Sequence, residues 1–341
     1  MAFAVIDCGT TNSRLYLLDE DRRMLAQGTR KIGVRDTAIT GSKAALRQGL
    51  ASLLRETLAQ ANLSLDQLRF AITAGMITSE LGLVEVPHRP APVGLAELAA
   101  HIQVLNDAAL FPCPLLLIPG VKNAFPAAAS TRDIRKIDFM RGEETQVAGL
   151  LATQPALTRP LVLVILSSHT KYVYVDVQDR ITGSLTNLSG QVYAAITKET
   201  SIGKSLHPDG PAPADYFDTT VIESAREAVT QCGFLRALIM PRFLEVLLAR
   251  PWYERALFLN TAIATEDLKV MADFPLVGFR QDAANYVLVG NTVRCRLLAY
   301  LMQQSGIPAD RVHQCTDKAK IDQLSIQGAL AIAWKSGYLQ R

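Results

Sequence analysis

The chain has 341 residues, of which 49% are hydrophobic and 20% are charged; at roughly 150 residues per domain this length predicts about two globular domains, and the composition excludes disorder over most of the sequence. The 35 Lys and Arg residues against 32 Asp and Glu residues leave a net charge of +3, which is too small and too scattered to indicate a nucleic-acid or membrane partner. The five cysteines have no CxxC spacing, and neither a signal peptide nor an apolar run of the roughly 18 residues that span a bilayer is recognisable, so we expect a cytoplasmic protein without disulfides or zinc.

The first part of the chain predicts a hairpin, a third strand and a helix. Residues 3–7 form an apolar run, a CGTTN turn follows, and residues 13–18 resume the apolar pattern, which is typical of a β-hairpin. The segment MLAQGTRKIG adds a third strand, and leucines at helical spacing within residues 41–60 predict an amphipathic helix packed on this sheet. Two further apolar runs, at residues 70–74 and 115–118, predict strands that each end in a loop.

The turn after the first strand carries groups that suit a phosphate. Gly9 has the backbone freedom that lets successive N–H groups point into one concavity, and Thr10 and Thr11 add hydroxyl donors. Asp7 would repel a phosphate unless a hydrated Mg²⁺ stands between them, and magnesium commonly binds one or two carboxylates together with phosphate oxygens. We therefore expect Gly9, Thr10, Thr11 and Asn12 at a phosphate and Asp7 as a magnesium ligand. A hairpin without a ligand is the alternative interpretation.

The second half of the chain repeats the pattern of the first. A strand, a Ser/Thr-rich turn, a second strand opened by a basic residue and an Asp/Arg turn occur in LVLVILSSHTKYVYVDVQDR, as in FAVIDCGTTNSRLYLLDEDRR. We interpret this as an internal structural repeat, with two unrelated hairpins as the alternative, and expect two domains, 1–155 and 156–341. Farther on, YVLVGNTVRCRLLAYLMQQ predicts a strand, a Gly-Asn turn and a helix, residues 208–213 predict a loop, and SIQGALAIAW predicts a last helix.

These segments resemble a known family. DCGTTNSR is similar to the first phosphate loop of the sugar kinases in the actin and hexokinase superfamily. AGMITSELGLVEVPH, DFMRGEETQVAGL, SSHTKYVYV and LSGQVYAAITKETSI follow in the order found in the 2-dehydro-3-deoxygalactonokinase family, and the last third resembles it mainly through LVGNTVRCRLLAYL. The resemblance implies an α/β fold of two ribonuclease-H-like domains, as in actin-like ATPases, with a cleft between them. The N-terminal domain would bind the acceptor and the C-terminal domain the nucleotide.

Phosphoryl transfer also requires a carboxylate at the acceptor hydroxyl, and the segment RGEETQVAGLL offers two. Glu143 and Glu144 lie in the first turn of a predicted helix, where the helix dipole favours negative charge. Acidic residues are also common in that turn as caps without a catalytic role. The resemblance favours Glu144 as the catalytic base, with Glu143 and Asp138 as alternatives.

The resemblance places the nucleotide at two turns of the second half. One is a second phosphate loop, where the family usually has Gly-Thr-His-Ser-Lys and this chain has Ser167 in place of the glycine. The other is the adenosine turn, where a glycine lets the nucleotide approach a helix N-terminus. The residues expected at these turns are Ser168, His169, Thr170 and Lys171 in the phosphate loop, and Gly290 and Asn291 in the adenosine turn.

Loops of the first domain are expected to bind the acceptor, with Arg or Lys paired to a sugar-acid carboxylate. The chain departs from the family here, because Glu80 and Leu83 stand where the family commonly has an arginine and a tryptophan. Cys8 and Gln191 likewise replace a tryptophan and a glutamate, so the identity of the acceptor stays open. The candidate acceptor residues are Arg14, Gly75, Met76, Ser79, Glu80, Arg89, Lys122 and Asn123.

Together these features predict an ATP- and Mg²⁺-dependent kinase that phosphorylates a 2-keto-3-deoxy sugar acid or a related small carbohydrate, with a homodimer left open. An exopolyphosphatase-like phosphohydrolase is one alternative, because it shares the phosphate cradle. A non-catalytic actin-like or sugar-binding protein is the other. Acceptor-dependent release of ADP distinguishes the kinase from both.

Overall fold

The computed structural model describes residues 1–339, which fall into two units. The first unit comprises Met1–Pro160, Val173–Ser184 and the chain from Ala319 onward, and the second comprises Leu161–Tyr172 and Leu185–Lys318. The first transition, after Pro160, lies close to the boundary expected from the sequence, whereas the last helix returns to the first unit. The division into domains 1–155 and 156–341 stays a prediction.

A six-stranded sheet lies at the centre of the first unit. Its strands, in spatial order, are β3 (Met24–Arg30), β2 (Ser13–Asp19), β1 (Ala2–Cys8), β4 (Leu68–Gly75), β7 (Leu115–Leu117) and β6 (Gln103–Leu105). Strand β1 pairs antiparallel with β2, where Cys8 lies opposite Ser13, and parallel with β4, where Cys8 lies opposite Gly75. The ends of β1 and β4 therefore lie at the same edge of the sheet. The expected hairpin, third strand and two later strands are confirmed.

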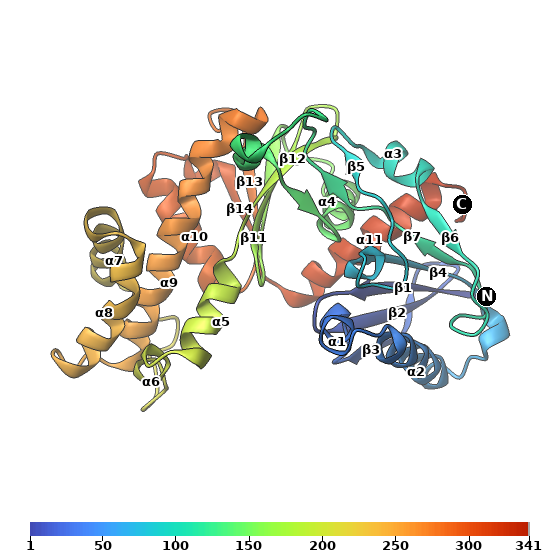
Figure 1. Cartoon of the computed structure of the whole chain (residues 1–341), viewed down its shortest axis with the longest axis horizontal. Coiled ribbons are helices and arrows are strands. Elements are labelled where there is room, and N and C mark those ends of the chain that lie inside the picture. Colours follow the sequence, from blue (N-terminus) through green and yellow to red (C-terminus); the bar gives the residue numbers. More distant parts are fainter. Residues whose placement is uncertain (340–341) are drawn as a thin grey trace. The chain divides into compact units, whose positions relative to one another are not determined.

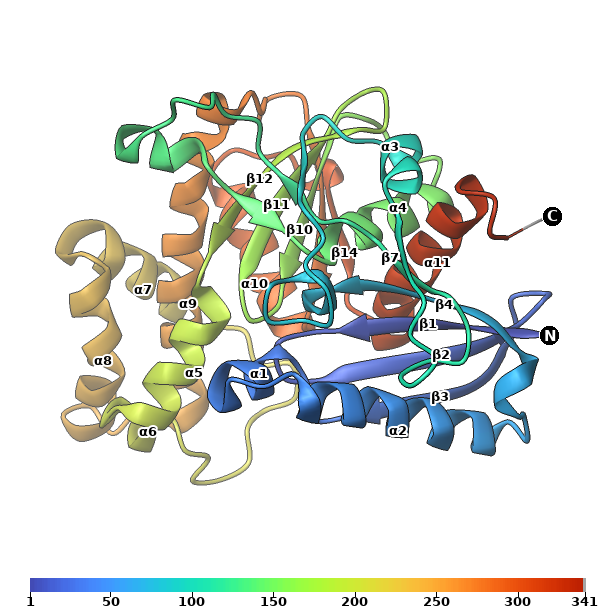
Figure 2. The ribbon, with the colours of Figure 1, turned by 45° about the vertical axis from the view of Figure 1, so that its right-hand side comes forward.

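Helices and a small second sheet complete the first unit. Helix α2 (Ala44–Gln60) packs on β2 and β3 through buried leucines (Figure 2), among them Leu46, Leu50 and Leu53. The predicted helix is therefore confirmed. Each buried leucine stabilises the packing by about 1.5–3 kcal/mol because its side chain leaves water. Neither α1 nor the small sheet is predicted by the sequence patterns. The remaining elements are α1 (Val34–Thr40), α3 (Leu95–Ala100), α4 (Glu143–Thr153), α11 (Lys318–Lys335), β5 (Arg89–Pro90), β8 (Val121–Lys122) and β9 (Phe139–Met140).

A five-stranded sheet repeats the strand order of the first. Its strands, in spatial order, are β12 (Ile181–Asn187), β11 (Thr170–Val175), β10 (Leu161–Leu166), β13 (Asn285–Gly290) and β14 (Val312–Cys315). Residues of β11 and β12 belong partly to each unit. Strands β10, β13 and β14 are parallel neighbours, as are β1, β4 and β7. The five strands correspond in order to β3, β2, β1, β4 and β7 of the first sheet, which supports the internal repeat and the α/β fold with two related sheets.

The second unit adds a group of helices to its sheet. Helix α9 packs against α7, α8 and α10 (Figure 1), and the buried residues Ile222, Leu257 and Leu297 join α7, α9 and α10 in one hydrophobic cluster. The expected helix after the Gly-Asn turn is confirmed as α10, and residues 208–213 form the expected loop. The helices are α5 (Ser189–Glu199), α6 (Ile202–Ser205), α7 (Thr219–Cys232), α8 (Phe234–Val246), α9 (Trp252–Leu268) and α10 (Thr292–Gln304).

Candidate functional site

The turn of residues 9–12, at the tip of the β1–β2 hairpin, is shaped by backbone hydrogen bonds. The amide of Gly9 donates to the carbonyl of Asn12 at 2.9 Å, and the amide of Arg35 in α1 donates to the carbonyl of Thr10 at 2.9 Å. The side chains of Thr10 and Asn12 are exposed. The turn therefore offers polar groups to a ligand from a fixed backbone.

Asp7, next to this turn, lies in a concentration of acidic groups. Nη1 of Arg14 is 3.5 Å from Oδ2 of Asp7 and 3.9 Å from Oδ1 of Asp322 in α11. Burial raises the pKa of Asp7, Arg14 lowers it, and the charges of Asp322 and Glu143 raise it further. Arg14 thus lies between two carboxylates, and a third, that of Glu143, acts on Asp7.

The end of β4 approaches the start of α4. Gly75 has a φ of +88°, and a Cβ at this residue would lie 2.8 Å from the carbonyl oxygen of Cys8, so a side chain is excluded there. A Cβ at Gly142 would lie 3.4 Å from the Cα of Gly75. The phosphate turn, the end of β4 and the RGEET segment therefore meet at one edge of the first unit.

The two glutamates that begin α4 have different surroundings. Glu143 is half-buried, and its Oε2 accepts a hydrogen bond from the amide of Arg141 at 3.1 Å. Glu144 has no exposed surface, and both of its carboxylate oxygens lie 2.8 Å from the donating amide of Gly142. Burial, and then the charge of Glu143, raise the pKa of Glu144 to about 8.

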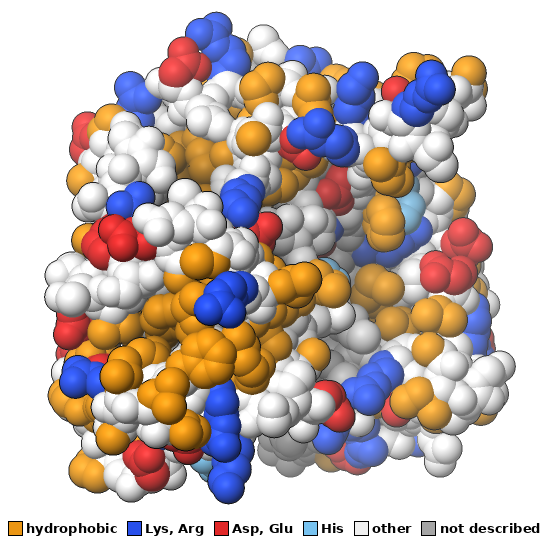
Figure 3. All heavy atoms as spheres, turned by 60° about the vertical axis from the view of Figure 1, so that its left-hand side comes forward, with side chains coloured by type: hydrophobic (Ala, Val, Ile, Leu, Met, Phe, Trp, Pro, Cys, Tyr) orange, Lys and Arg blue, Asp and Glu red, His pale blue; other side chains and the backbone are white. Residues whose placement is uncertain are grey.

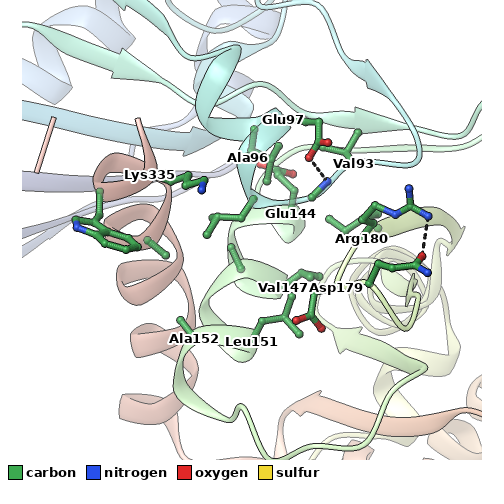
Figure 4. Close-up of a pocket in the computed structure, with 18 residues that line it drawn as sticks. Val93, Ala96, Glu97, Glu144, Val147, Leu151, Ala152, Asp179, Arg180 and Lys335 are labelled. Atoms are coloured by element: carbon green, nitrogen blue, oxygen red, sulfur yellow. Dashed lines mark hydrogen bonds between the residues drawn. The ribbon is translucent and has the colours of Figure 1, made fainter. Parts of the chain in front are cut away.

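Glu144 also lines a cavity of about 520 Å³ within the first unit. Figure 4 shows that its neighbours there include Val147 and Leu151 of α4, Glu97 of α3 and Arg180 of the β11–β12 turn. None of the eight candidate acceptor residues lines this cavity. Glu144 therefore borders a cavity that the candidate acceptor residues do not line, although its carboxylate stays hydrogen-bonded to Gly142, the neighbour of Gly75.

Arg141, which the sequence analysis did not select, ties the start of α4 to the loop after β4. Its Nη1 donates to Oγ1 of Thr78 at 2.9 Å, and its Nη2 donates to the carbonyl of Val86 at 2.7 Å. The only sequence signal was its place in the FMRGEET segment. These bonds fix the loop that carries several candidate acceptor residues.

The candidate acceptor residues differ in how accessible their polar groups are. Glu80 is exposed and Met76, Arg89 and Lys122 are partly exposed, with Lys122 Nζ 5.0 Å from the ring centre of Phe125. Ser79 is buried, and its hydroxyl donates to the carbonyl of Met76 at 2.7 Å.

Asn123 is buried as well. Its Nδ2 donates to the carbonyls of Lys136 and Ser184, each at 2.9 Å, and its Oδ1 accepts from the amide of Ser184 at 2.7 Å. Ser184 Oγ also lies 3.3 Å from Oδ1 of Asp138. Asn123 and Asp138 are therefore parts of an internal network, and neither amide hydrogen of Asn123 is left for a ligand.

In the second unit, the predicted phosphate loop and adenosine turn border one cavity of about 510 Å³. Ser168 is exposed and lines it, and its Oγ lies 3.2 Å from Nδ1 of His169. Gly290 ends β13, and Asn291 caps α10 with its Oδ1, which accepts from the amide of Val293 at 2.9 Å. Lys171 is buried within β11 and is not among the residues that line this cavity.

Two further polar residues of this cavity, Asp267 of α9 and Arg294 of α10, were not selected from the sequence. Asp267 is 4% exposed, and its Oδ2 accepts from Oγ1 of Thr170 at 2.8 Å. Its Oδ1 accepts from Nδ2 of Asn187 at 3.0 Å and from the hydroxyl of Ser189. Burial raises the pKa of Asp267, and these three donors lower it. An isolated Asp in a helix and an Arg after a turn gave no distinguishing signal in one sequence.

Comparison with known proteins identifies related chains. The sequence model of a family described as 2-keto-3-deoxy-galactonokinase matches residues 7–325. A curated relative from Rhizobium meliloti (strain 1021), named as a 2-dehydro-3-deoxygalactonokinase, is 28% identical over 215 residues. That alignment covers 63% of this chain and 61% of the relative, so it spans less than two thirds of the relative's length.

Solved structures share the fold. A crystal structure from Sinorhizobium meliloti, described as a 2-dehydro-3-deoxygalactonokinase protein, has a TM-score of 0.71 at 21% identity and covers 97% of this chain and 98% of its own. Component A of the (R)-2-hydroxyglutaryl-CoA dehydratase of Acidaminococcus fermentans has a TM-score of 0.50 at 11% identity, covering 98% of this chain and 96% of its own. The expected α/β fold of actin-like ATPases and sugar kinases is confirmed.

Proposed function

The chain belongs to the 2-keto-3-deoxy-galactonokinase family, and from that premise we propose that it transfers the terminal phosphoryl group of ATP to a hydroxyl of 2-keto-3-deoxygalactonate or a closely related sugar acid. The observation that carries this proposal is the family match over residues 7–325, which spans both phosphate loops and the RGEET segment. The phosphohydrolase and the non-catalytic protein considered from the sequence find no support in that match.

The first unit would provide the acceptor chemistry. A carboxylate at the start of α4 accepts the proton of the attacking hydroxyl, and we assign this role to Glu143 ahead of Glu144, which the sequence favoured. Glu143 is half-buried and its charge acts on Asp7, whereas Glu144 is enclosed and hydrogen-bonded to Gly142. A base within reach of the hydroxyl typically contributes about 10²–10⁴ in rate.

The carboxylate of a sugar acid needs a cation, and three of the candidate acceptor residues in the first unit are cationic. Arg14 is already balanced by Asp7 and Asp322, so Arg89 of β5 and Lys122 of the neighbouring strand β8 are the better candidates. Glu80 is exposed and Leu83 is buried in the core, so the residues that depart from the family leave these two cations in place.

Magnesium fits the acidic surroundings of Asp7. A bound Mg²⁺ neutralises phosphate charge during transfer and commonly takes one or two protein carboxylates. Asp7 and its neighbours Glu143 and Asp322 supply an excess of negative charge that Arg14 offsets only in part. We therefore assign Asp7 to the metal, with Gly9, Thr10, Thr11 and Asn12 at a phosphate.

The cavity of the second unit would hold the nucleotide. Its lining combines Ser168 of the second phosphate loop and Asn291 of the adenosine turn with the aromatic side chains of Tyr193 and Trp252. Its volume of about 510 Å³ lies in the range of small-molecule sites, roughly 300–1,000 Å³. The sequence assignments of His169, Thr170 and Gly290 to this site are kept as part of the proposal.

A coupled assay of ADP release tests the function. The purified chain is given ATP and Mg²⁺ with 2-keto-3-deoxygalactonate, other 2-keto-3-deoxy acids, aldonic and uronic acids, or neutral sugars. We expect ADP only when a 2-keto-3-deoxy acid is present, and stoichiometric phosphorylated product. Phosphate release without an acceptor would identify a hydrolase, and no turnover with any acceptor would contradict the proposal.

Partners and location stay predictions. Within residues 1–339 the structure contains no helix with both the length and the apolar character to cross a membrane. Figure 3 shows hydrophobic side chains gathered in part of the face that it draws. Independently of that view, the exposed apolar residues include Leu235 and Val246 of α8 and Leu247 and Leu248 directly after it. Their exposure alone does not specify a partner, so the homodimer stays open.

A further inference from the structure

Arg294 brings a positive charge to the second phosphate loop, where the sequence analysis expected Lys171 to do so. Its Nη1 donates to the carbonyl of Ser167 at 2.8 Å and its Nη2 donates to Oγ1 of Thr170 at 3.2 Å. It also lines the cavity of the second unit. Lys171 is 7% exposed and is not among the lining residues. The cation that this cavity presents at the loop is therefore an arginine from α10.

The guanidinium of Arg294 has N–H donors that its hydrogen bonds to the loop do not use. Arginine carries five N–H donors in a planar fork that matches the oxygens of a phosphate. The two hydrogen bonds to the loop use two of the five, which leaves the other three for a ligand. Burial lowers the pKa of Arg294 from its usual range, and the nearby charge of Asp267 opposes that shift. The side chain is thus partly desolvated, which strengthens a charge-assisted hydrogen bond.

Asp267 holds the loop and the arginine together through Thr170. Oγ1 of Thr170 donates to Asp267 at 2.8 Å and accepts from Arg294 at 3.2 Å. The same carboxylate accepts hydrogen bonds from the side chains of Asn187 and Ser189. Asp267 therefore connects β11, β12, α5 and α9 at one buried point. A guanidinium tied to this network has fewer rotamers to lose when it binds a ligand.

We propose that Arg294 is a phosphate-binding residue of the nucleotide cavity and that Asp267 is the positioning residue that orients it and Thr170. The inference rests on the proposed function, since that function makes the ligand a nucleoside triphosphate. It adds which cation meets the phosphate chain and what holds that cation in place. The guanidinium then contacts phosphate oxygens, and the adenosine part of the ligand lies elsewhere in the cavity.

The test measures binding by calorimetry, with ATP, ADP and adenosine as probes and no acceptor. Arg294→Met should weaken ATP and ADP about ten- to a hundredfold, the usual effect of losing charge-assisted hydrogen bonds, and should leave adenosine unchanged. Arg294→Lys should recover part of the loss. The matched control is Arg296→Met on the same helix, because Arg296 is exposed over the ring of Phe217 and is not a lining residue. It should bind all three probes as the parent does.

The role of Asp267 is tested with Asp267→Asn and the double variant. Asp267→Asn should also weaken ADP but not adenosine, and the double variant should lose little more than Arg294→Met alone, because the two residues act as one unit. Circular dichroism verifies that each variant is folded. Equal weakening of adenosine and ADP in a folded Arg294→Met chain would show a purely structural role and overturn the inference. So would unchanged ADP binding.

The same measurements separate this inference from the proposed function. If the parent chain binds ADP through Arg294 but forms no ADP with any acceptor, the phosphate-binding role of Arg294 is supported and the kinase assignment is contradicted. If the parent chain is an active kinase and its Arg294→Met variant binds ADP as the parent does, the kinase assignment is supported and the role of Arg294 is contradicted. A parent chain that binds none of the three probes overturns both.

Discussion

The two consecutive glutamates at the start of α4 differ in burial, because neighbouring residues of a helix point in different directions from its axis. Glu143 acts electrostatically on Asp7, beside the first phosphate turn. Glu144 is enclosed, hydrogen-bonded to the amide of Gly142, and is one of the residues that line the cavity of about 520 Å³. Position in the sequence cannot separate two adjacent acidic residues, whereas burial does. This difference is the basis for proposing Glu143, and not Glu144, as the base.

We predict that Glu143→Gln lowers kcat by at least about tenfold with the acceptor, because it removes the proton acceptor while keeping the side-chain shape. Glu144→Gln should lower kcat less, since glutamine can still accept the hydrogen bond from Gly142. Steady-state kinetics with saturating ATP, together with ADP binding as the control for an intact second unit, measure both. The reverse order of effects would instead identify Glu144 as the base, as the resemblance favoured.

At the scale of elements, the position of α4 depends on its close contact with α11. A Cβ at Gly149 would lie 1.8 Å from the carbonyl oxygen of Leu324, and a Cβ at Gly328 would lie 1.8 Å from that of Thr145. Each helix thus places a glycine against the backbone of the other. The helix that carries Glu143 is located by contacts far along the chain from the motif itself.

We predict that Gly149→Ala destabilises the chain by about 1–3 kcal/mol, because the added methyl group pushes the two helices apart. It should also reduce turnover, since α4 carries at its start the glutamate that we propose as the base. Thermal unfolding and kcat are the measurements. Gly210→Ala is the matched control, because no atom lies within 4 Å of a Cβ built there, and it should change neither quantity. Equal effects of the two substitutions would show that the contact between α4 and α11 does not position the site.

For the whole molecule, local patterns predicted most strands of the two large sheets, whereas several contacts at the candidate site have no local pattern in the sequence. The hairpin with its turn at residues 9–12, the helix α2 with its leucines and the strands of the repeated hairpin follow from apolar spacing that stays within one segment. Helix α8 contains Pro241, which obscures a helical pattern, and the small sheet is built from two-residue strands. Asp267, Arg294 and Arg141 were not selected from the sequence because their hydrogen-bond partners lie far away along the chain; Thr170, for example, is 97 residues from Asp267. No spacing rule in one sequence identifies such pairs.

The stability of the whole chain should report the state of Glu144, because unfolding exposes this carboxyl to water. Burial raises its pKa from the ordinary value of 4.5 to about 8 in the folded chain. The folded state therefore keeps a proton that the unfolded state loses, so the stabilisation is fully present below about pH 4.5 and is lost as the pH rises through about 8. We predict that the free energy of unfolding of the parent falls relative to that of Glu144→Gln across this window, by at most about 1.4 kcal/mol per pH unit.

The variant removes the titrating group while keeping the acceptor for Gly142, so the difference between the two chains isolates this carboxyl from all others. Denaturant unfolding of both chains between about pH 5 and about pH 8 measures that difference, and a value independent of pH would mean that Glu144 is ionised in the folded chain throughout.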